Sequence, residues 1–94
     1  MRQTILIAGC GDLGNAIGER LLKAGHRVYG LRRNIAQLSD SIHPIAYDLR
    51  SNSPLPNLPS VDYLVYAAAA KSRDLEVYRS IYVDAPLKLM RSLV

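Results

Sequence analysis

Three glycines near the N-terminus have the spacing of a phosphate-binding loop. Gly9, Gly11 and Gly14 form a GxGxxG pattern between an apolar run and a segment with helical periodicity. In that setting the first glycine permits a tight turn, the second lets a pyrophosphate approach the backbone, and the third lets the helix pack against a sheet. The helix N-terminus, which includes Asp12 and Leu13, would offer free N–H groups to phosphates. The pattern predicts a dinucleotide-binding loop, with a purely geometric strand-turn-helix as the alternative.

An arginine pair stands where the cofactor would be selected. An NAD site usually has an acidic residue at the end of its second strand, which binds the ribose 2′-hydroxyl. Here the stretch YGLRR ends in Arg32 and Arg33 and contains no acid. Two guanidinium groups can pair with a 2′-phosphate and stack on adenine. The sequence therefore favours NADP, with NAD as the alternative cofactor and two solvated surface arginines as the alternative interpretation.

Two further stretches follow predicted strands and are expected on the same rim. Asp48 and Leu49 come after the third strand, and Ala67, Ala68 and Ala69 come at the end of the fourth. The carboxylate could accept a hydrogen bond from the adenine amino group, and small side chains leave room for ribose and adenine. A turn-forming aspartate and alanines packed in a core are the alternatives.

Apolar periodicity predicts the elements that must position these residues. Strands are expected at residues 4–8, 26–31, 42–47 and 63–67, and helical segments at 12–24, 34–39 and 75–94. This alternation indicates an α/β fold with a parallel sheet. Right-handed crossovers then give a Rossmann-like, doubly wound but partial sheet of four strands in the order 3-2-1-4. Gly25 is placed to end the first helix, and Pro44 favours an edge position for the third strand.

The last helical segment contains a proline, which leaves two interpretations open. Asp84 could cap a new helix with Pro86 in its first turn, or Pro86 could distort one longer helix. The fourth strand is very apolar for an edge strand, and the sequence stops within a helical pattern. Residues 1–94 are therefore expected to be the N-terminal part of a larger dinucleotide-binding protein, with a mini-domain covered by a partner as the alternative.

Composition narrows the classes of partner. The chain has 94 residues, 49% hydrophobic and 21% charged, which is typical of one globular domain rather than of disorder. Its net charge is +4, but no basic stripe is interleaved with aromatics, so no nucleic-acid partner is expected. No apolar run approaches the ~18 residues of a membrane span. A single cysteine, Cys10, fits a reducing, cytoplasmic location. The expected partner is a small-molecule substrate of unknown identity, and a homo-oligomer is left open.

The order of these motifs resembles a known family. GCGDLG, AGHRVYGLRRN, YDLR, VDYLVYAAAA and YRSIYVDAPLKLMRSL follow one another as at the start of NAD(P)-dependent epimerase/dehydratase proteins, the extended and atypical short-chain dehydrogenases/reductases. The resemblance implies that the glycines form the cofactor loop and that Arg33 is the arginine closing strand 2. It also places the Asp48-Leu49 pair at the adenine and Ala67 to Ala69 along the cofactor. The GxGxxG spacing departs from the GxxGxxG of extended members, and Pro86 stands where threonine is common.

The resemblance also implies a catalytic Tyr-x-x-x-Lys pair, which this sequence lacks. No tyrosine is followed by a lysine four residues later, so we predict neither a catalytic residue nor a metal ligand. The expected function is the NADP-binding part of an oxidoreductase or epimerase/dehydratase, with enzymatic activity expected only for a full-length protein. A redox-silent NADP-binding sensor is the main alternative. A different dinucleotide-binding class, such as a ketopantoate-reductase-like or hydroxyacid dehydrogenase, is another.

Overall fold

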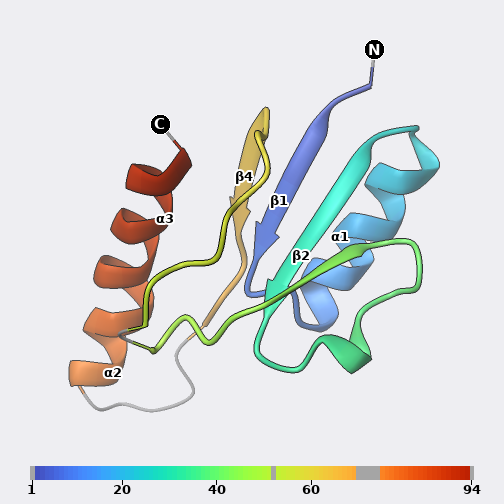
Figure 1. Cartoon of the computed structure of the whole chain (residues 1–94). Coiled ribbons are helices and arrows are strands. Elements are labelled where there is room, and N and C mark those ends of the chain that lie inside the picture. Colours follow the sequence, from blue (N-terminus) through green and yellow to red (C-terminus); the bar gives the residue numbers. More distant parts are fainter. Residues whose placement is uncertain (1, 52, 70–74, 94) are drawn as a thin grey trace.

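A parallel sheet of four strands forms the centre of the computed structural model, which describes residues 2–51, 53–69 and 75–93 (Figure 1). The strands are β1 (Thr4–Ala8), β2 (Arg27–Arg32), β3 (His43–Ala46) and β4 (Tyr63–Tyr66). Their order is β3-β2-β1-β4, so the predicted order 3-2-1-4 and the α/β class are confirmed. In the register of the sheet, Leu6 pairs with Tyr29 on β2 and with Leu64 on β4.

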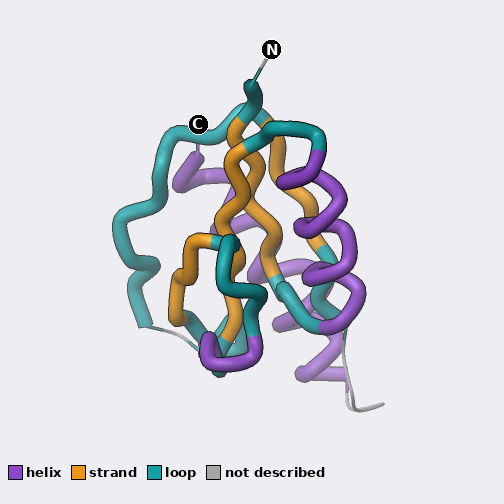
Figure 2. The backbone as a smooth tube through the Cα atoms, turned by 90° about the vertical axis from the view of Figure 1, so that its right-hand side faces the viewer, coloured by secondary structure: helices purple, strands orange, loops and turns teal. Residues whose placement is uncertain are grey.

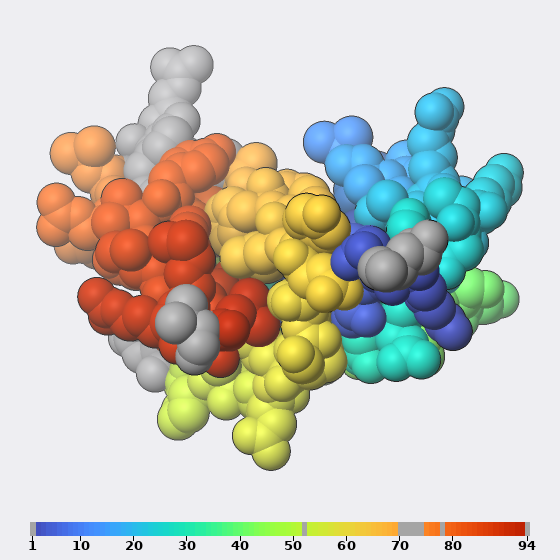
Figure 3. All heavy atoms as spheres, turned by 90° about the horizontal axis from the view of Figure 1, so that it is seen from above, coloured from blue at the N-terminus to red at the C-terminus, as the bar shows by residue number. Residues whose placement is uncertain are grey.

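Helices cover both faces of the sheet. The helix α1 (Asp12–Lys23) joins β1 to β2, and the short 3-10 turn η1 (Ile35–Gln37) precedes β3. The C-terminal helix consists of α2 (Leu75–Arg79), the π-helical turn η2 (Ser80–Asp84) and α3 (Ala85–Leu93). Seen from above, α1 and the C-terminal helix lie on opposite sides of β4 (Figure 3). No helix among residues 2–51, 53–69 and 75–93 is long and apolar enough to cross a membrane.

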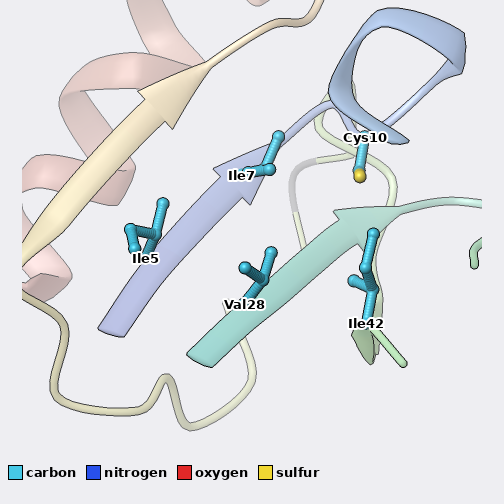
Figure 4. Packing of buried hydrophobic residues seen from close by; sticks show 5 residues of the cluster. All are labelled: Ile5, Ile7, Cys10, Val28 and Ile42. Carbon is cyan, nitrogen blue, oxygen red and sulfur yellow. The ribbon is translucent and has the colours of Figure 1, made fainter. Parts of the chain in front are cut away.

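Alternation along β1 explains the two-layered core. Ile5 and Ile7 face α1, where they pack with Val28 and Ile42 (Figure 4). Leu6 and Ala8 point the other way, toward Leu31, Tyr47 and Leu89. Because successive side chains of a strand point to opposite faces, a strand that is apolar throughout is buried on both sides.

The ends of the elements follow local rules. Gly25 has φ +92, its N–H donates to the carbonyl of Leu22, and the next N–H, of His26, donates to that of Leu21. This pair of bonds is the Schellman arrangement, in which a glycine adopts the left-handed conformation just past the helix end. The predicted cap is therefore confirmed. β3, which contains Pro44, lies at one edge of the sheet as expected.

The long connection from β3 to β4 returns along the face covered by α3, as the two side views show (Figures 1 and 2). Leu55, Leu58 and Val61 from this connection pack against the cluster that contains Leu6 and Leu89. Residues 53–60 of this connection have no regular secondary structure, but its leucines contribute to the core.

Pro86 distorts one continuous helix rather than starting a new one. Helical structure runs from Leu75 to Leu93, and the π turn ends at Asp84, two residues before the proline. The N–H of Ala85 donates to the carbonyl of Ser80, five residues back. Pro86 has no N–H, so the carbonyl of Ile81 receives no helical bond from it, and the hydroxyl of Tyr66 donates to that carbonyl instead. Of the two interpretations open from the sequence, the distorted long helix is correct.

Candidate functional site

A groove of about 760 Å³ lies where the strands end, and every predicted site residue lines it. Those residues are Gly9, Gly11, Asp12, Leu13, Gly14, Arg32, Arg33, Asp48, Leu49, Ala67, Ala68 and Ala69. They come together because the strands are parallel, so that the loops after β1, β2, β3 and β4 meet at one edge of the sheet. The volume lies within the range of roughly 300–1,000 Å³ found for ligand sites. We call this cavity the groove.

Gly9 forms a turn that only glycine accommodates. Its φ is +77, and a Cβ atom there would lie 2.5 Å from the backbone and Cβ of Ala68. The N–H groups of Gly9 and Cys10 both donate to the carbonyl of Leu31, at 2.9 and 3.0 Å. The loop is therefore held between the end of β2 and the alanine segment after β4.

Gly11, in contrast, faces open space. A Cβ atom on it would meet nothing within 4 Å, and its φ of −81 is accessible to any residue. The absence of a side chain at Gly11 is therefore not required by packing. It leaves the backbone accessible from the groove.

The N-terminus of α1 presents unpaired donors to the groove. The first helical bond runs from the N–H of Asn15 to the carbonyl of Gly11, at 2.8 Å, and no side chain caps the helix. The N–H groups of Asp12, Leu13 and Gly14 have no acceptor within the part of the chain that the structure describes. These donors and the positive end of the helix dipole favour an anion.

Gly14 allows α1 to approach the sheet closely, as its spacing predicted. A Cβ atom there would lie 3.1 Å from Ile7 Cγ2 and 3.2 Å from Cys10 Sγ. Both contacts are tighter than ordinary van der Waals packing. A larger residue at Gly14 would therefore push the helix N-terminus away from β1.

The two arginines occupy different environments. Arg32 is partly buried, and its guanidinium donates from Nη1 to the carbonyl of Cys10 at 3.2 Å and from Nη2 to Gln37 Oε1 at 3.0 Å. Arg33 is exposed and makes no hydrogen bond or ion pair with any residue that the structure describes. The interpretation of two freely solvated arginines therefore applies to Arg33 only.

Asp48 initiates a turn at the rim of the groove. Its Oδ1 accepts the N–H of Arg50 at 2.9 Å, and its carbonyl accepts the N–H of Ser51 at 2.9 Å. The turn-forming role that the sequence offered as an alternative is thus present. Asp48 nevertheless lines the groove, and Oδ2 has no partner among the described residues.

A lysine from the far end of the chain fixes the loop that follows. Lys88 Nζ donates to the hydroxyl of Tyr47 at 2.6 Å and to the carbonyl of Ser51 at 3.0 Å. The same hydroxyl donates to the carbonyl of Ser53 at 2.5 Å, and Tyr47 is only 8% exposed. Because its proton is directed at a backbone carbonyl, this tyrosine holds the loop in place.

Cys10 is enclosed below the glycine loop rather than open to the groove. It is fully buried, and this burial raises the pKa of its thiol, while the positive charge of Arg32 acts in the opposite direction. Within residues 2–51, 53–69 and 75–93, no cluster of three His, Cys, Asp or Glu side chains could hold a metal ion.

The groove is electropositive overall. Its charged lining residues are Arg32, Arg33 and Arg50, against Asp12 and Asp48. An excess of positive side chains in a concave site attracts anions. The groove is therefore suited to an anionic ligand.

Sequence reasoning missed several lining residues. These are Asn34, Gln37, Tyr47, Arg50, Val77 and Ile81. The position of Asn34 could have been inferred from the sequence, because asparagine is a favoured helix-capping residue. In the structure its Oδ1 accepts the N–H of Ala36 at 3.1 Å. Val77 and Ile81 are four residues apart and so share one helix face, but nothing local indicates that this face borders the groove.

Comparisons of the chain with protein-family models, with curated proteins and with solved structures gave no match. The family resemblance therefore rests on the order of the sequence motifs alone.

Proposed function

We propose that this chain is the NADP-binding part of an NAD(P)-dependent oxidoreductase or epimerase/dehydratase, built on a Rossmann-like sheet. The observation that carries the proposal is the convergence of the glycine loop, the arginine pair, Asp48-Leu49 and the alanine segment on one groove. In open parallel sheets, ligands bind outside the carboxyl ends of the strands, where the strand order reverses. That point here lies between β1 and β4, next to Gly9 and Ala68.

Each part of the groove suits one part of a dinucleotide. The free N–H groups after Gly11 would hold the pyrophosphate, which can come close because Gly11 has no side chain. Asp48, through its unpartnered Oδ2, would accept a hydrogen bond from the adenine amino group. Leu49 and the alanines Ala67 to Ala69 would provide the apolar surface beside adenine and ribose.

The arginines support NADP rather than NAD. β2 ends in Arg32 and is followed by Arg33, with no carboxylate among the last residues of the strand to receive a ribose hydroxyl. A 2′-phosphate is a dianion that guanidinium groups bind through charge-assisted hydrogen bonds. The preference for NADP therefore comes from this end of the groove.

Bound NADP would supply hydride-transfer chemistry, and the described residues of this chain would bind and orient it. A redox-silent NADP-binding sensor remains the second candidate, because it needs the same groove but no catalytic pair, and the sequence contains no Tyr-x-x-x-Lys. Oxidation of NADPH by the protein with any substrate of a carbonyl panel would exclude the sensor.

A fluorescence titration with NADPH and NADH tests the cofactor assignment. We expect tighter binding of NADPH, and we expect Arg33→Ala to weaken it by about ten- to a hundredfold, since a charge-assisted hydrogen bond contributes roughly 1.5–3 kcal/mol. NADH binding should be unchanged in this variant. Similar dissociation constants for both cofactors in the unmodified protein would refute the assignment to NADP.

Gly11→Ala tests whether the groove is the binding site. The new methyl group enters open space, so the fold should lose about 1 kcal/mol or less from the changed helix cap. The same methyl group stands where the pyrophosphate would approach, so both cofactors should bind more weakly. Unchanged affinity for both cofactors in a folded Gly11→Ala protein would place the ligand elsewhere.

A further inference from the structure

The 3-10 turn η1, which follows β2, contacts Arg32 through the side-chain amide of one residue, Gln37. Gln37, the last residue of η1, accepts a hydrogen bond from Arg32 Nη2 through its side-chain oxygen at 3.0 Å. Arg32 Nη1 reaches in the other direction, to the carbonyl of Cys10 in the glycine loop, at 3.2 Å. The guanidinium is thus held at two points between the glycine loop and η1.

The backbone of Gln37 is itself fixed to α1. Asn15 Nδ2 donates to the carbonyl of Gln37 at 2.9 Å, and Asn15 Oδ1 accepts the N–H of Ser39 at 3.2 Å. One asparagine on the first helix therefore holds the chain at Gln37, whose side chain contacts Arg32, and again two residues later at Ser39. These two hydrogen bonds fix the position of Gln37 relative to the N-terminus of α1.

The side-chain amide of Gln37 is neutral, so its hydrogen bond leaves the positive charge of Arg32 uncompensated. A guanidinium has five N–H donors, and two of its hydrogen bonds are made here, both to neutral oxygens. No carboxylate forms an ion pair with Arg32 within the described part of the chain. A carboxylate in place of the amide would neutralise the guanidinium, whereas glutamine orients it and leaves its charge and its remaining donors for an anion.

We propose that Gln37 is a positioning residue that sets the preference of the groove for a ligand with a 2′-phosphate by holding Arg32 over the glycine loop. This inference rests on the proposed function, because it concerns the same groove. Gln37 lies outside the sequence motifs, and it would favour NADP over NAD indirectly, by positioning Arg32.

The test compares dissociation constants for NADPH and NADH in three variants. Gln37→Ala should weaken NADPH binding by about three- to tenfold, as expected for one lost hydrogen bond, and leave NADH unchanged. Gln37→Glu keeps the shape but places a carboxylate on Arg32, so it should abolish or invert the preference for NADPH. Ser39→Ala is the control. It removes a hydrogen bond between the same segment and Glu19 without contacting Arg32, and the NADPH/NADH ratio should not change.

The outcomes separate this inference from the proposed function. If the unmodified protein prefers NADPH and both Gln37 variants keep that ratio, the role of Gln37 is overturned while NADP binding stands. If the Gln37 variants weaken the binding of NADPH and NADH equally, Gln37 has only a structural role, and its proposed role in selecting the cofactor is also overturned. If the unmodified protein binds neither cofactor, or binds both equally, the proposed cofactor site fails, and the role of Gln37 fails with it.

Discussion

The hydrogen bond from Tyr66 to the carbonyl of Ile81 joins the sheet to the C-terminal helix. Tyr66 is the last residue of β4, directly before the alanine segment of the groove, and Ile81 lies in the π turn and lines the groove. Pro86 has no N–H to give that carbonyl. Tyr66→Phe therefore leaves a carbonyl without its partner, while the ring that packs against the core is retained.

The expected loss of stability can be estimated from this geometry. A buried carbonyl left without a partner costs about 1–3 kcal/mol, and the lower part of that range, about 1–2 kcal/mol, applies because Tyr66 is only partly buried. For a domain of this size, 1 kcal/mol corresponds to about 4–8 °C in Tm. Thermal and urea unfolding, followed by circular dichroism, should show the loss with an unchanged m-value.

A double-mutant cycle with Pro86→Ala tests the cause. An alanine at this position supplies an N–H for the carbonyl of Tyr82, so the helix can return to α-helical register and Ala85 can donate to Ile81. In that background Tyr66→Phe should cost less than about 0.5 kcal/mol, which gives a measurable coupling energy between the two sites.

Equal losses in both backgrounds would refute the reasoning, because they would show that the carbonyl does not depend on the missing N–H of the proline. No loss in either background would show that water satisfies the carbonyl as well as the tyrosine does. A lowered m-value in Tyr66→Phe would indicate a change in the folded or unfolded ensemble instead of the loss of one bond.

Three further outcomes follow from the same structure. Burial, with a smaller effect of Tyr82, raises the pKa of Tyr66 to about 12. The folded state therefore binds this proton more tightly than the unfolded state, so the resulting contribution to the free energy of unfolding is complete below about pH 10 and is lost toward pH 12. Between these pH values the urea midpoint should fall less in Tyr66→Phe than in the unmodified protein. Gly9→Ala should lower the urea midpoint far more than Gly11→Ala does, because φ is +77 at Gly9 and a Cβ there lies 2.5 Å from its neighbour; equal midpoints would contradict the turn geometry. Cys10 is fully buried and the pKa of its thiol is raised, so a disulfide reagent should modify it slowly in the native protein and rapidly in urea; immediate native labelling would show that the loop is open.

Much of the fold was predictable because its signals are local. The apolar run at residues 4–8 predicted a strand buried on both faces, and Gly25 predicted the end of α1. The strand order followed from the handedness of crossover connections, and Pro44 pointed to an edge. The predicted site residues line one groove, because the carboxyl ends of parallel strands share one edge of the sheet.

Other features had no local signal. The segment at residues 34–39 was expected to be a short helix, and only Ile35–Gln37 form a 3-10 turn. Pro86 was compatible with two geometries, and the choice between them depended on Tyr66, a residue on a strand that supplies the missing hydrogen-bond donor. Sequence spacing alone could not have paired these two positions.

The sequence by itself determined the order of the elements and the placement of the glycine loop, because these depend on periodicity, turn residues and chain handedness over a few neighbouring positions. Tertiary structure alone decided which side chains meet. Lys88 reaches Tyr47 across 41 positions, and Asn15 holds Gln37 across 22. Contacts over such separations depend on how the layers pack, and no short sequence pattern encodes that packing. The sequence motif identified Arg32 as a candidate ligand-binding residue, whereas only the tertiary structure shows that the side-chain amide of Gln37 contacts it.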